Sequence, residues 1–225
     1  MVYLIIILGL LIGSFISAVT YRIPRNLDFI KGRSFCDSCK QKLKWYDNIP
    51  LFSFLHYKSR SRCCGQKISI RYPLIELFTA LGFVVLYLSS LSPIYYILYT
   101  ISLAIFIIDL EHQIIPDELS WLILLLGLIN FSFVNLFAGF FFSLLLLTLY
   151  LVTKGRGMGL GDVKLAIPLG LWLGLERGIT WLITTFIIGG IVAVVLLSLK
   201  KAKLKTKIAF GPFLILAFWI TLLII

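Results

Sequence analysis

Long uncharged stretches dominate this chain and alternate with short charged segments. Residues 1–21 carry no charged side chain, and two longer uncharged runs cover 77–108 and 119–153. Shorter uncharged runs cover 178–199 and 208–225. A helix needs about 20 apolar residues, at 1.5 Å each, to cross a bilayer. Each run therefore has about the length of one membrane helix or more.

The two longest runs exceed a single span and contain turn signals. The run 77–108 is interrupted by the Ser- and Pro-rich segment 89–93, and the run 119–153 is interrupted at 130–135, between two asparagines. These breaks predict a hairpin of two helices in each run. A weaker stretch at 161–178 predicts a short or tilted span. The sequence thus predicts an all-α polytopic membrane protein with about eight transmembrane helices, or seven if that stretch only dips into the membrane.

Composition agrees with a membrane protein. Of 225 residues, 60% are hydrophobic and 14% are charged, whereas soluble globular chains are roughly 45–50% apolar. A single soluble core of this size cannot bury so much apolar surface. Composition therefore excludes a disordered chain and an ordinary soluble enzyme.

Positive charge gives an orientation. Of the 21 Lys and Arg residues, all but Arg177 fall in the segments 21–72, 154–164 and 200–207. With eight spans and an outside N-terminus, these three segments face the cytoplasm, as the positive-inside rule requires. We attribute the net charge of +11 to topology and to contact with anionic membrane lipid. Nucleic acid is not expected as a partner.

The chain divides into a first transmembrane helix (1–21), a cytoplasmic loop domain (22–72) and a membrane-embedded helical domain (73–225). The loop domain contains all the cysteines of the chain, which are Cys36, Cys39, Cys63 and Cys64. Disulfides are rare in a reducing cytosol, and a C-x-x-C knuckle turns two thiolates toward one point, as tetrahedral zinc requires.

The second half of this predicted metal site is irregular. Ser61 stands where a second C-x-x-C would begin, so Cys63 is the candidate for the fourth thiolate. The sequence predicts a structural zinc held by the four cysteines, which would supply much of the folding energy of so polar a loop. The alternative is a set of inert or redox-active thiols.

Two aspartates lie at the edges of apolar helices. Asp109 closes the run 77–108, and Asp162 follows Gly161 at the start of a helical segment. Carboxylates beside membrane helices are costly and often functional. Two carboxylates in one site hold a single proton, so that one orients and deprotonates water while the other protonates a scissile carbonyl oxygen. The alternatives are an interfacial loop acid for Asp109 and a helix cap for Asp162.

The order of these motifs resembles the type IV prepilin peptidases, which are bifunctional leader peptidases and N-methyltransferases of pilus, type II secretion and competence systems. The motifs are Gly13-Ser14-Phe15, Tyr21-Arg22-Ile23-Pro24, Trp45 to Pro50, Ile68-Ser69-x-Arg71-Tyr72-Pro73-x-x-Glu76, Ile115-Pro116-Asp117 and Gly159-x-Gly161-Asp162-x-Lys164. The resemblance makes Asp109 and Asp162 the catalytic pair. It places the family's metal loop at Cys36, Cys39 and Cys64, with its fourth cysteine replaced by Ser61.

The resemblance implies a function and a location. The substrates are prepilin or pseudopilin precursors, whose basic leader is removed after Gly at the cytoplasmic face of the bacterial cytoplasmic (inner) membrane. The new N-terminus is then methylated with S-adenosylmethionine, for which the segment 21–72 is the natural place. Two roles remain open for Glu76. It either forms an ion pair with Arg71 or takes part in the peptidase or the methyltransferase site.

A different class of function competes with the peptidase. Intramembrane carboxylates also carry ions or protons in polytopic transporters, usually near the bilayer midplane. Here the acids cluster at one predicted face, and no internal repeat is evident. The sequence therefore favours the peptidase.

The topology can be tested with a thiol reagent that does not cross membranes. Applied to intact cells, the reagent should leave the four native cysteines unlabelled, because the loop domain is predicted to face the cytoplasm. It should label a cysteine added after Ile225, which is predicted to lie outside. The opposite labelling pattern would rule out the eight-span topology.

Overall fold

The computed structural model of the protein describes residues 1–28, 33–130, 132–155, 157–200 and 208–224. Some positions used in the charge argument lie outside these described residues: Lys31, Arg156, the lysines of 201–207 and Ile225. The described chain forms two compact units, Met1–Thr100 and Ile101–Ile225, whose boundary falls within one helix. Each unit is described by itself.

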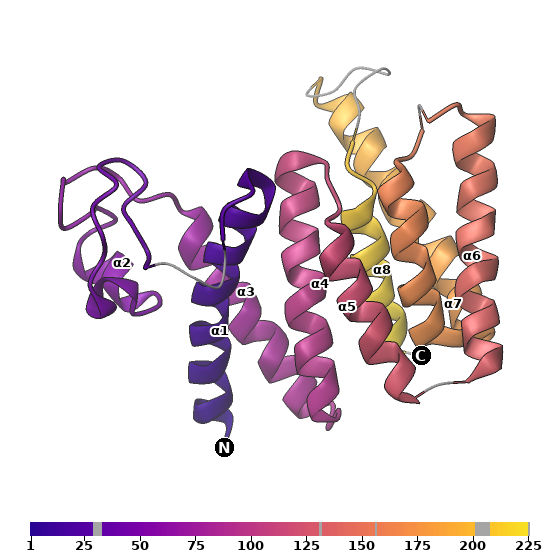
Figure 1. The fold of residues 1–225 in the computed structure, drawn as a ribbon, viewed down its shortest axis with the longest axis horizontal. Helices are drawn as coiled ribbons and strands as arrows, with labels where there is room; N and C mark the ends of the chain where they lie inside the picture. The colour runs from indigo at the N-terminus through magenta and orange to yellow at the C-terminus, as the bar shows by residue number, and fades with distance from the viewer. Residues whose placement is uncertain (29–32, 131, 156, 201–207, 225) are drawn as a thin grey trace. The chain divides into compact units, whose positions relative to one another are not determined.

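The regular elements of the described chain are helical (Figure 1). The α-helices are α1 (Val2–Arg22), α2 (Phe52–His56), α3 (Arg71–Leu88), α4 (Pro93–His112), α5 (Asp117–Gly127), α6 (Phe133–Val152), α7 (Leu160–Ser198) and α8 (Gly211–Ile224). The 3-10 helices are η1 (Ile23–Arg25), η2 (Trp45–Asn48) and η3 (Leu128–Asn130).

Within the described residues, five helices are long and apolar enough to cross a membrane. They are Val2–Arg25, Arg71–Leu88, Pro93–His112, Phe133–Val152 and Leu160–Ser198. The helices α5 and α8 are shorter, with 11 and 14 residues. These elements confirm the predicted all-α polytopic membrane class.

Both predicted hairpin breaks are present. The first lies between Leu88, the end of α3, and Pro93, the start of α4. The second lies between Gly127 and Phe133. However, α3 begins at Arg71, before the uncharged run at 77–108, so charged residues occupy its first turns.

The helix α7 combines the two spans that were predicted at 161–178 and 178–199. It has 39 residues, about twice the length needed to cross a bilayer. Its backbone leaves the helical conformation at Gly174, with φ of 71° and ψ of −173°. Such a conformation strongly favours glycine. The break therefore lies at Gly174, four residues before the predicted boundary.

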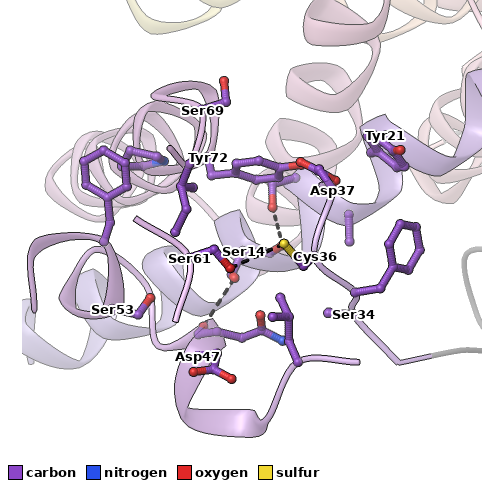
Figure 2. A pocket seen from close by; sticks show the side chains of 18 of the residues that line it. Ser14, Tyr21, Ser34, Cys36, Asp37, Asp47, Ser53, Ser61, Ser69 and Tyr72 are labelled. Atoms are coloured by element: carbon purple, nitrogen blue, oxygen red, sulfur yellow. Dashed lines mark hydrogen bonds between the residues drawn. The ribbon is translucent and has the colours of Figure 1, made fainter. Parts of the chain in front are cut away.

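Close contact between α1 and α3 holds the first unit together. An added Cβ atom at Gly9 would lie 2.6 Å from the Cα of Ala80, and one at Gly13 would lie 2.6 Å from the Cα of Glu76. Small residues let membrane helices approach this closely. Beside this contact, α1, α3 and the loop domain enclose a cavity (Figure 2).

Three tryptophans connect the helices of the second unit through their indole N–H groups. Their acceptors lie on neighbouring helices: the carbonyl of Ile123 for Trp172 (3.2 Å), the carbonyl of Leu214 for Trp181 (2.8 Å) and the hydroxyl of Ser102 for Trp219 (2.9 Å). A hydrogen bond satisfies a polar group that would otherwise be costly to bury. These bonds fix α8 against α4 and α7.

Candidate functional site

Asp109 lies in the last turn of α4, on the buried face of that helix. Ile105 and Ile108 are fully buried on the same face, and Asp109 itself is only 4% exposed. Its Oδ2 atom is buried and has no hydrogen-bond partner among the described residues. Because an unsatisfied buried oxygen costs free energy, this atom is suited to binding a water molecule or a polar group of a substrate.

Asp162 lies in the first turn of α7 and is 5% exposed. Its Oδ2 atom accepts a hydrogen bond of 2.9 Å from the backbone N–H of Gly159. A carboxylate at this position satisfies one of the free amides at the helix start, and the helix dipole favours its charge. Asp162 therefore stabilises the start of α7, as expected for the helix cap that was the alternative role for this residue. It is also buried beside a second acid.

The structure brings these two aspartates together, although 53 positions separate them in the chain. Their carboxylates are close enough to interact electrostatically. Ile115 packs against both neighbouring helix starts, because an added Cβ atom at Gly161 would lie 3.1 Å from one Ile115 carbon and one at Gly211 would lie 3.0 Å from another. Two interacting, buried carboxylates are the arrangement that a shared-proton pair requires.

Gly211 is part of this site and was missed in the sequence. It lies at the start of α8, directly against the carboxylate of Asp109. A Cβ atom at Gly211 would lie 2.6 Å from Asp109 Oδ2, so no larger residue fits without a shift. The only signal was Gly211-Pro212 at the start of the last apolar run, because proline is common at helix starts.

The other acids of this region lie apart from the pair. Asp117, at the start of α5, accepts hydrogen bonds of 2.7 and 3.0 Å from Lys164 Nζ. Both side chains are more than half exposed, so this ion pair adds about 0–1 kcal/mol at most. Glu111 lies 4.0 Å from the imidazole of His112. Their exposure indicates interfacial acids outside the buried pair.

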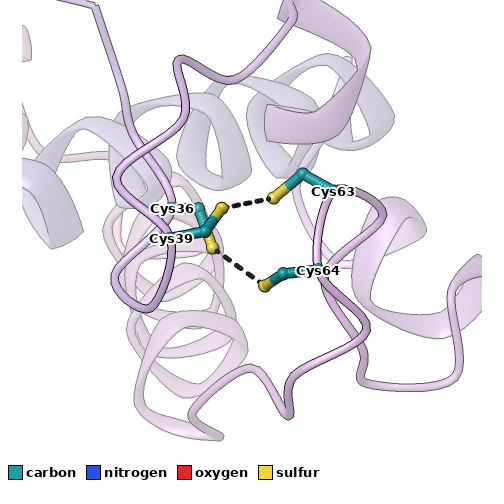
Figure 3. A group of neighbouring side chains, drawn as sticks. All are labelled: Cys36, Cys39, Cys63 and Cys64. Carbon is teal, nitrogen blue, oxygen red and sulfur yellow. Dashed lines mark hydrogen bonds between the residues drawn. The ribbon is translucent and has the colours of Figure 1, made fainter.

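The four cysteines of the first unit form one cluster (Figure 3). Their Sγ atoms all lie within 4.8 Å of one another. Cys36 and Cys64 are 3.7 Å apart, and Cys39 and Cys63 are 3.1 Å apart. This set of four thiols could hold a metal ion, and Cys63 does reach the cluster from its position beside Cys64.

Two similar backbone turns build this cluster. Cys36 donates its backbone N–H to Gln41, and the bridge Phe35–Lys42 closes the first turn. Ser61 donates to Gln66 in the same way, and the bridge Arg60–Lys67 closes the second. Ser61 thus occupies the position that corresponds to Cys36, and its hydroxyl lies 3.3 Å from the Cys36 sulfur.

The thiols have unequal acidities. Burial raises the pKa of Cys36, but hydrogen bonds from the backbone amides of Cys39 and Ser38 and from Ser61 outweigh burial and lower the pKa to about 6. The hydrogen bond with Cys63 raises the pKa of Cys39 to about 12. The cluster alone therefore ionises only in part, and a bound cation is what would deprotonate the remaining thiols.

Glu76 faces the cavity of the first unit. Its Oε2 atom accepts a hydrogen bond of 2.8 Å from the backbone N–H of Leu51. Arg71 donates to the hydroxyl of Thr20 (2.8 Å) and to the carbonyl of Ser17 (3.3 Å). Glu76 is thus anchored to the loop domain, and Arg71 is anchored to α1.

Two interacting, buried aspartates at helix ends of a membrane protein are the arrangement expected in an intramembrane aspartic peptidase. Comparison with known proteins identifies the family. The model described as "Bacterial Peptidase A24 N-terminal domain" matches residues 7–90, and the model described as "Type IV leader peptidase family" matches residues 96–194. No solved structure matches the chain.

Full-length relatives agree with the family models. Three proteins named prepilin leader peptidase/N-methyltransferase are similar to this chain. The protein of Pectobacterium carotovorum is 32% identical and covers 92% of this chain and 88% of its own length. Those of Pseudomonas aeruginosa and Stutzerimonas stutzeri are 33% and 34% identical, each covers 97% of this chain, and the match spans 88% and 89% of their lengths. The chain belongs to the type IV leader peptidase family.

Proposed function

We propose that this protein cleaves the basic leader from prepilin-like precursors after Gly and then methylates the new N-terminus. Asp109 and Asp162 are the catalytic pair of the cleavage. The observation that carries this proposal is the burial of the two interacting carboxylates, one of which has an oxygen without a partner. Family membership and the names of the relatives support the same reaction.

The pair performs hydrolysis without a covalent intermediate. One carboxylate takes a proton from a water molecule, whose oxygen attacks the scissile carbonyl carbon, while the protonated partner donates to the carbonyl oxygen. The proton taken from water then passes to the leaving amine as the C–N bond breaks, and the partner carboxylate recovers its proton from a hydroxyl of the collapsing gem-diol. The free Oδ2 of Asp109 is a suitable acceptor for the water proton.

The substrate fits a site at the membrane edge. A precursor of this class has a basic leader followed by an apolar helix, so its helix lies in the bilayer and its cleavage point lies at one face. The positive-inside distribution supports the cytoplasmic face of the inner membrane for that point. A transporter is not favoured, because the relatives are named peptidases and both acids lie at helix ends.

Zinc is the metal that best fits the cysteine cluster. Four thiolates at about 2.3 Å from one zinc ion are about 3.8 Å from each other in a tetrahedron, near the 3.7 and 3.1 Å found for two pairs of sulfur atoms. Bound zinc would keep the four thiols ionised and close the two turns of the loop domain. S-adenosylmethionine is the proposed methyl donor.

The first test of this function replaces each aspartate. Asp109→Asn and Asp162→Asn should each lower the cleavage rate by at least about a thousandfold, because an amide cannot carry the proton. The double variant should be scarcely slower, since the pair acts as a unit. Both variants should still methylate a peptide supplied without its leader. Product masses from a prepilin peptide and S-adenosylmethionine measure both activities.

Controls are available on α4, which carries Glu111, and on α5, which carries Asp117. Asp117→Asn and Glu111→Gln should retain most of the cleavage activity, because these acids lie at the exposed entry to the helices. Rapid cleavage by either Asn variant of the pair would refute the aspartyl mechanism. Loss of both activities in a folded variant would show that the two activities are not independent.

The contact between Gly211 and Asp109 gives a second prediction. Gly211→Ala should lower cleavage at least tenfold, because its methyl group would displace Asp109 Oδ2. Gly190→Ala is the matched control, since an added Cβ atom there meets nothing within 4 Å. Methylation of the shortened peptide should not change in either variant. Normal cleavage by Gly211→Ala would remove Gly211 from the site.

The metal gives a third prediction. Elemental analysis of the purified protein should find about one zinc ion per chain. Cys63→Ser should lower that content, and adding Ser61→Cys should restore it, because Ser61 occupies the position equivalent to Cys36. Cys36→Ser and Cys39→Ser should make the loop domain more sensitive to proteases. Purified protein without zinc, or full zinc content in Cys63→Ser, would contradict the assigned ligands.

A further inference from the structure

The segment 45–56 of the loop domain carries an apolar surface. Three of its large hydrophobic side chains are largely exposed: Trp45 in η2 is 77% exposed, and Phe52 and Leu55 in α2 are 60% and 73% exposed. Single exposed hydrophobic side chains are normal, whereas several of them gathered in one short segment mark a contact surface. This segment is therefore expected to contact something other than water.

The short helix α2 divides its side chains between two faces. Phe54 and Tyr57, at the helix and directly after it, line the cavity of the first unit. Phe52 and Leu55 are three residues apart, and the ring of His56 stacks on that of Phe52 with centroids 5.6 Å apart. Residues three and four apart share one face of a helix. The exposed apolar side chains of α2 thus form one outer face, opposite the cavity.

Contacts with the membrane helices place this segment well below the ends of those helices. The Ser14 hydroxyl lies 3.5 Å from the carbonyl oxygen of Asn48, and Leu51 donates its backbone N–H to Glu76 at 2.8 Å. Ser14 lies eight residues before the end of α1, and Glu76 lies five residues after the start of α3. At 1.5 Å per residue, these positions are about 12 and 8 Å along the two helices.

This depth puts the segment at the level of the bilayer. With 21 residues, α1 has about the length of the hydrocarbon core, which is roughly 30 Å thick. A position about 12 Å from its end therefore lies inside the membrane boundary. Figure 1 likewise shows α2 at the height of the second half of α1 and not beyond its end.

The backbone of the segment has the partners that such a position requires. Irregular backbone is tolerated at membrane depth only where protein groups satisfy its N–H and C=O groups. The Leu51 N–H is satisfied by Glu76, and the Ile49 carbonyl accepts from both the hydroxyl and the N–H of Ser53. Glu76 thus provides an acceptor to a backbone amide that lipid could not satisfy.

Basic residues flank the apolar surface. Lys44 precedes η2, Lys58 and Arg60 follow α2, and all three are exposed. The only acid between Lys44 and Arg60 is Asp47, which is paired with Arg62 at 2.9 Å. An apolar, aromatic face with Lys and Arg beside it is typical of segments that lie in the interface of a bilayer with anionic lipids.

We propose that residues 45–56 insert into the bilayer at the face where α1 ends and α3 begins. Trp45, Phe52 and Leu55 lie among the lipid chains, and the flanking basic residues lie among the headgroups. Lipid is the occupant because the loop domain is tied at both ends to membrane helices, so the bilayer is always beside it. The inference depends on neither of the proposed catalytic activities.

The insertion can be tested on the wild-type protein by labelling from two sides. The full-length protein is placed in nanodiscs of phosphatidylcholine and phosphatidylglycerol. It is labelled either with a phosphatidylcholine that carries a diazirine on its acyl chain or with a water-soluble diazirine. Mass spectrometry then gives the ratio of acyl-chain label to aqueous label for each peptide. The ratio for residues 45–56 should be at least fivefold higher than that for the polar turn 60–67 and should approach that for α1.

Two results would overturn the proposal. A ratio for residues 45–56 equal to that of the turn 60–67 would show that the segment lies in water. Protection of residues 45–56 from both reagents would show that protein covers the surface, either a second copy of this chain or a bound partner.

A pair of variants tests the side chains themselves. Replacing both Phe52 and Leu55 with Asp should lower the acyl-chain label on residues 45–56 at least threefold, because charged side chains are costly to insert. The matched control exchanges the two residues, as Phe52→Leu with Leu55→Phe, and should keep the label within about twofold because the surface stays apolar. Unchanged zinc content and unchanged label on α1 verify folding. Wild-type labelling of the folded Asp variant would contradict the proposal, and the wild-type ratio decides the case if that variant does not fold.

Discussion

Burying two carboxylates side by side in an apolar helical unit is the constraint on which the second unit depends. An ionised carboxylate removed from water loses several kcal/mol of solvation unless other groups replace the water. Here the replacement for Asp162 comes from a backbone amide at a helix start, that of Gly159. The compensation is incomplete, because Asp109 Oδ2 has no partner among the described residues. In the proposed reaction, this free oxygen accepts the water molecule.

The need for close backbone approach explains why this site is rich in glycine. A side chain at Gly161 would press on Ile115, and one at Gly211 would press on both Ile115 and Asp109. Farther from the site, Trp181 and Trp219 bind acceptors on neighbouring helices and hold α8 in place. The position of Asp109 therefore depends on packing contacts between residues that are not proposed to be catalytic.

Bilayer thickness made most of the helices predictable, because the length of an uncharged run limits the number of spans. The break in α7 lies at Gly174 and not at the predicted position 178. The sequence alone does not distinguish Gly174 from the other glycines of this helix, because only the folded backbone shows which of them leaves the helical conformation. Asp109 and Asp162 were found through their motifs, but their contact depends on tertiary packing. Gly211 was missed, because Gly211-Pro212 signals a helix start and not the contact with Asp109, which arises only in the folded chain. The cavity beside Glu76 was equally hidden, since three separate segments line it.

The two proposed activities need different electrostatic environments, which gives a physical reason for placing them in different units. A hydrolytic pair of aspartates must retain one proton, so its site has to disfavour a second negative charge. A sulfonium donor, in contrast, is attracted by ionised carboxylates. In one shared pocket, a cation would draw the proton off the pair and stop hydrolysis. With Asp109 and Asp162 in the second unit and the loop domain, where methylation is expected, in the first, the two proposed activities share only the substrate's new N-terminus.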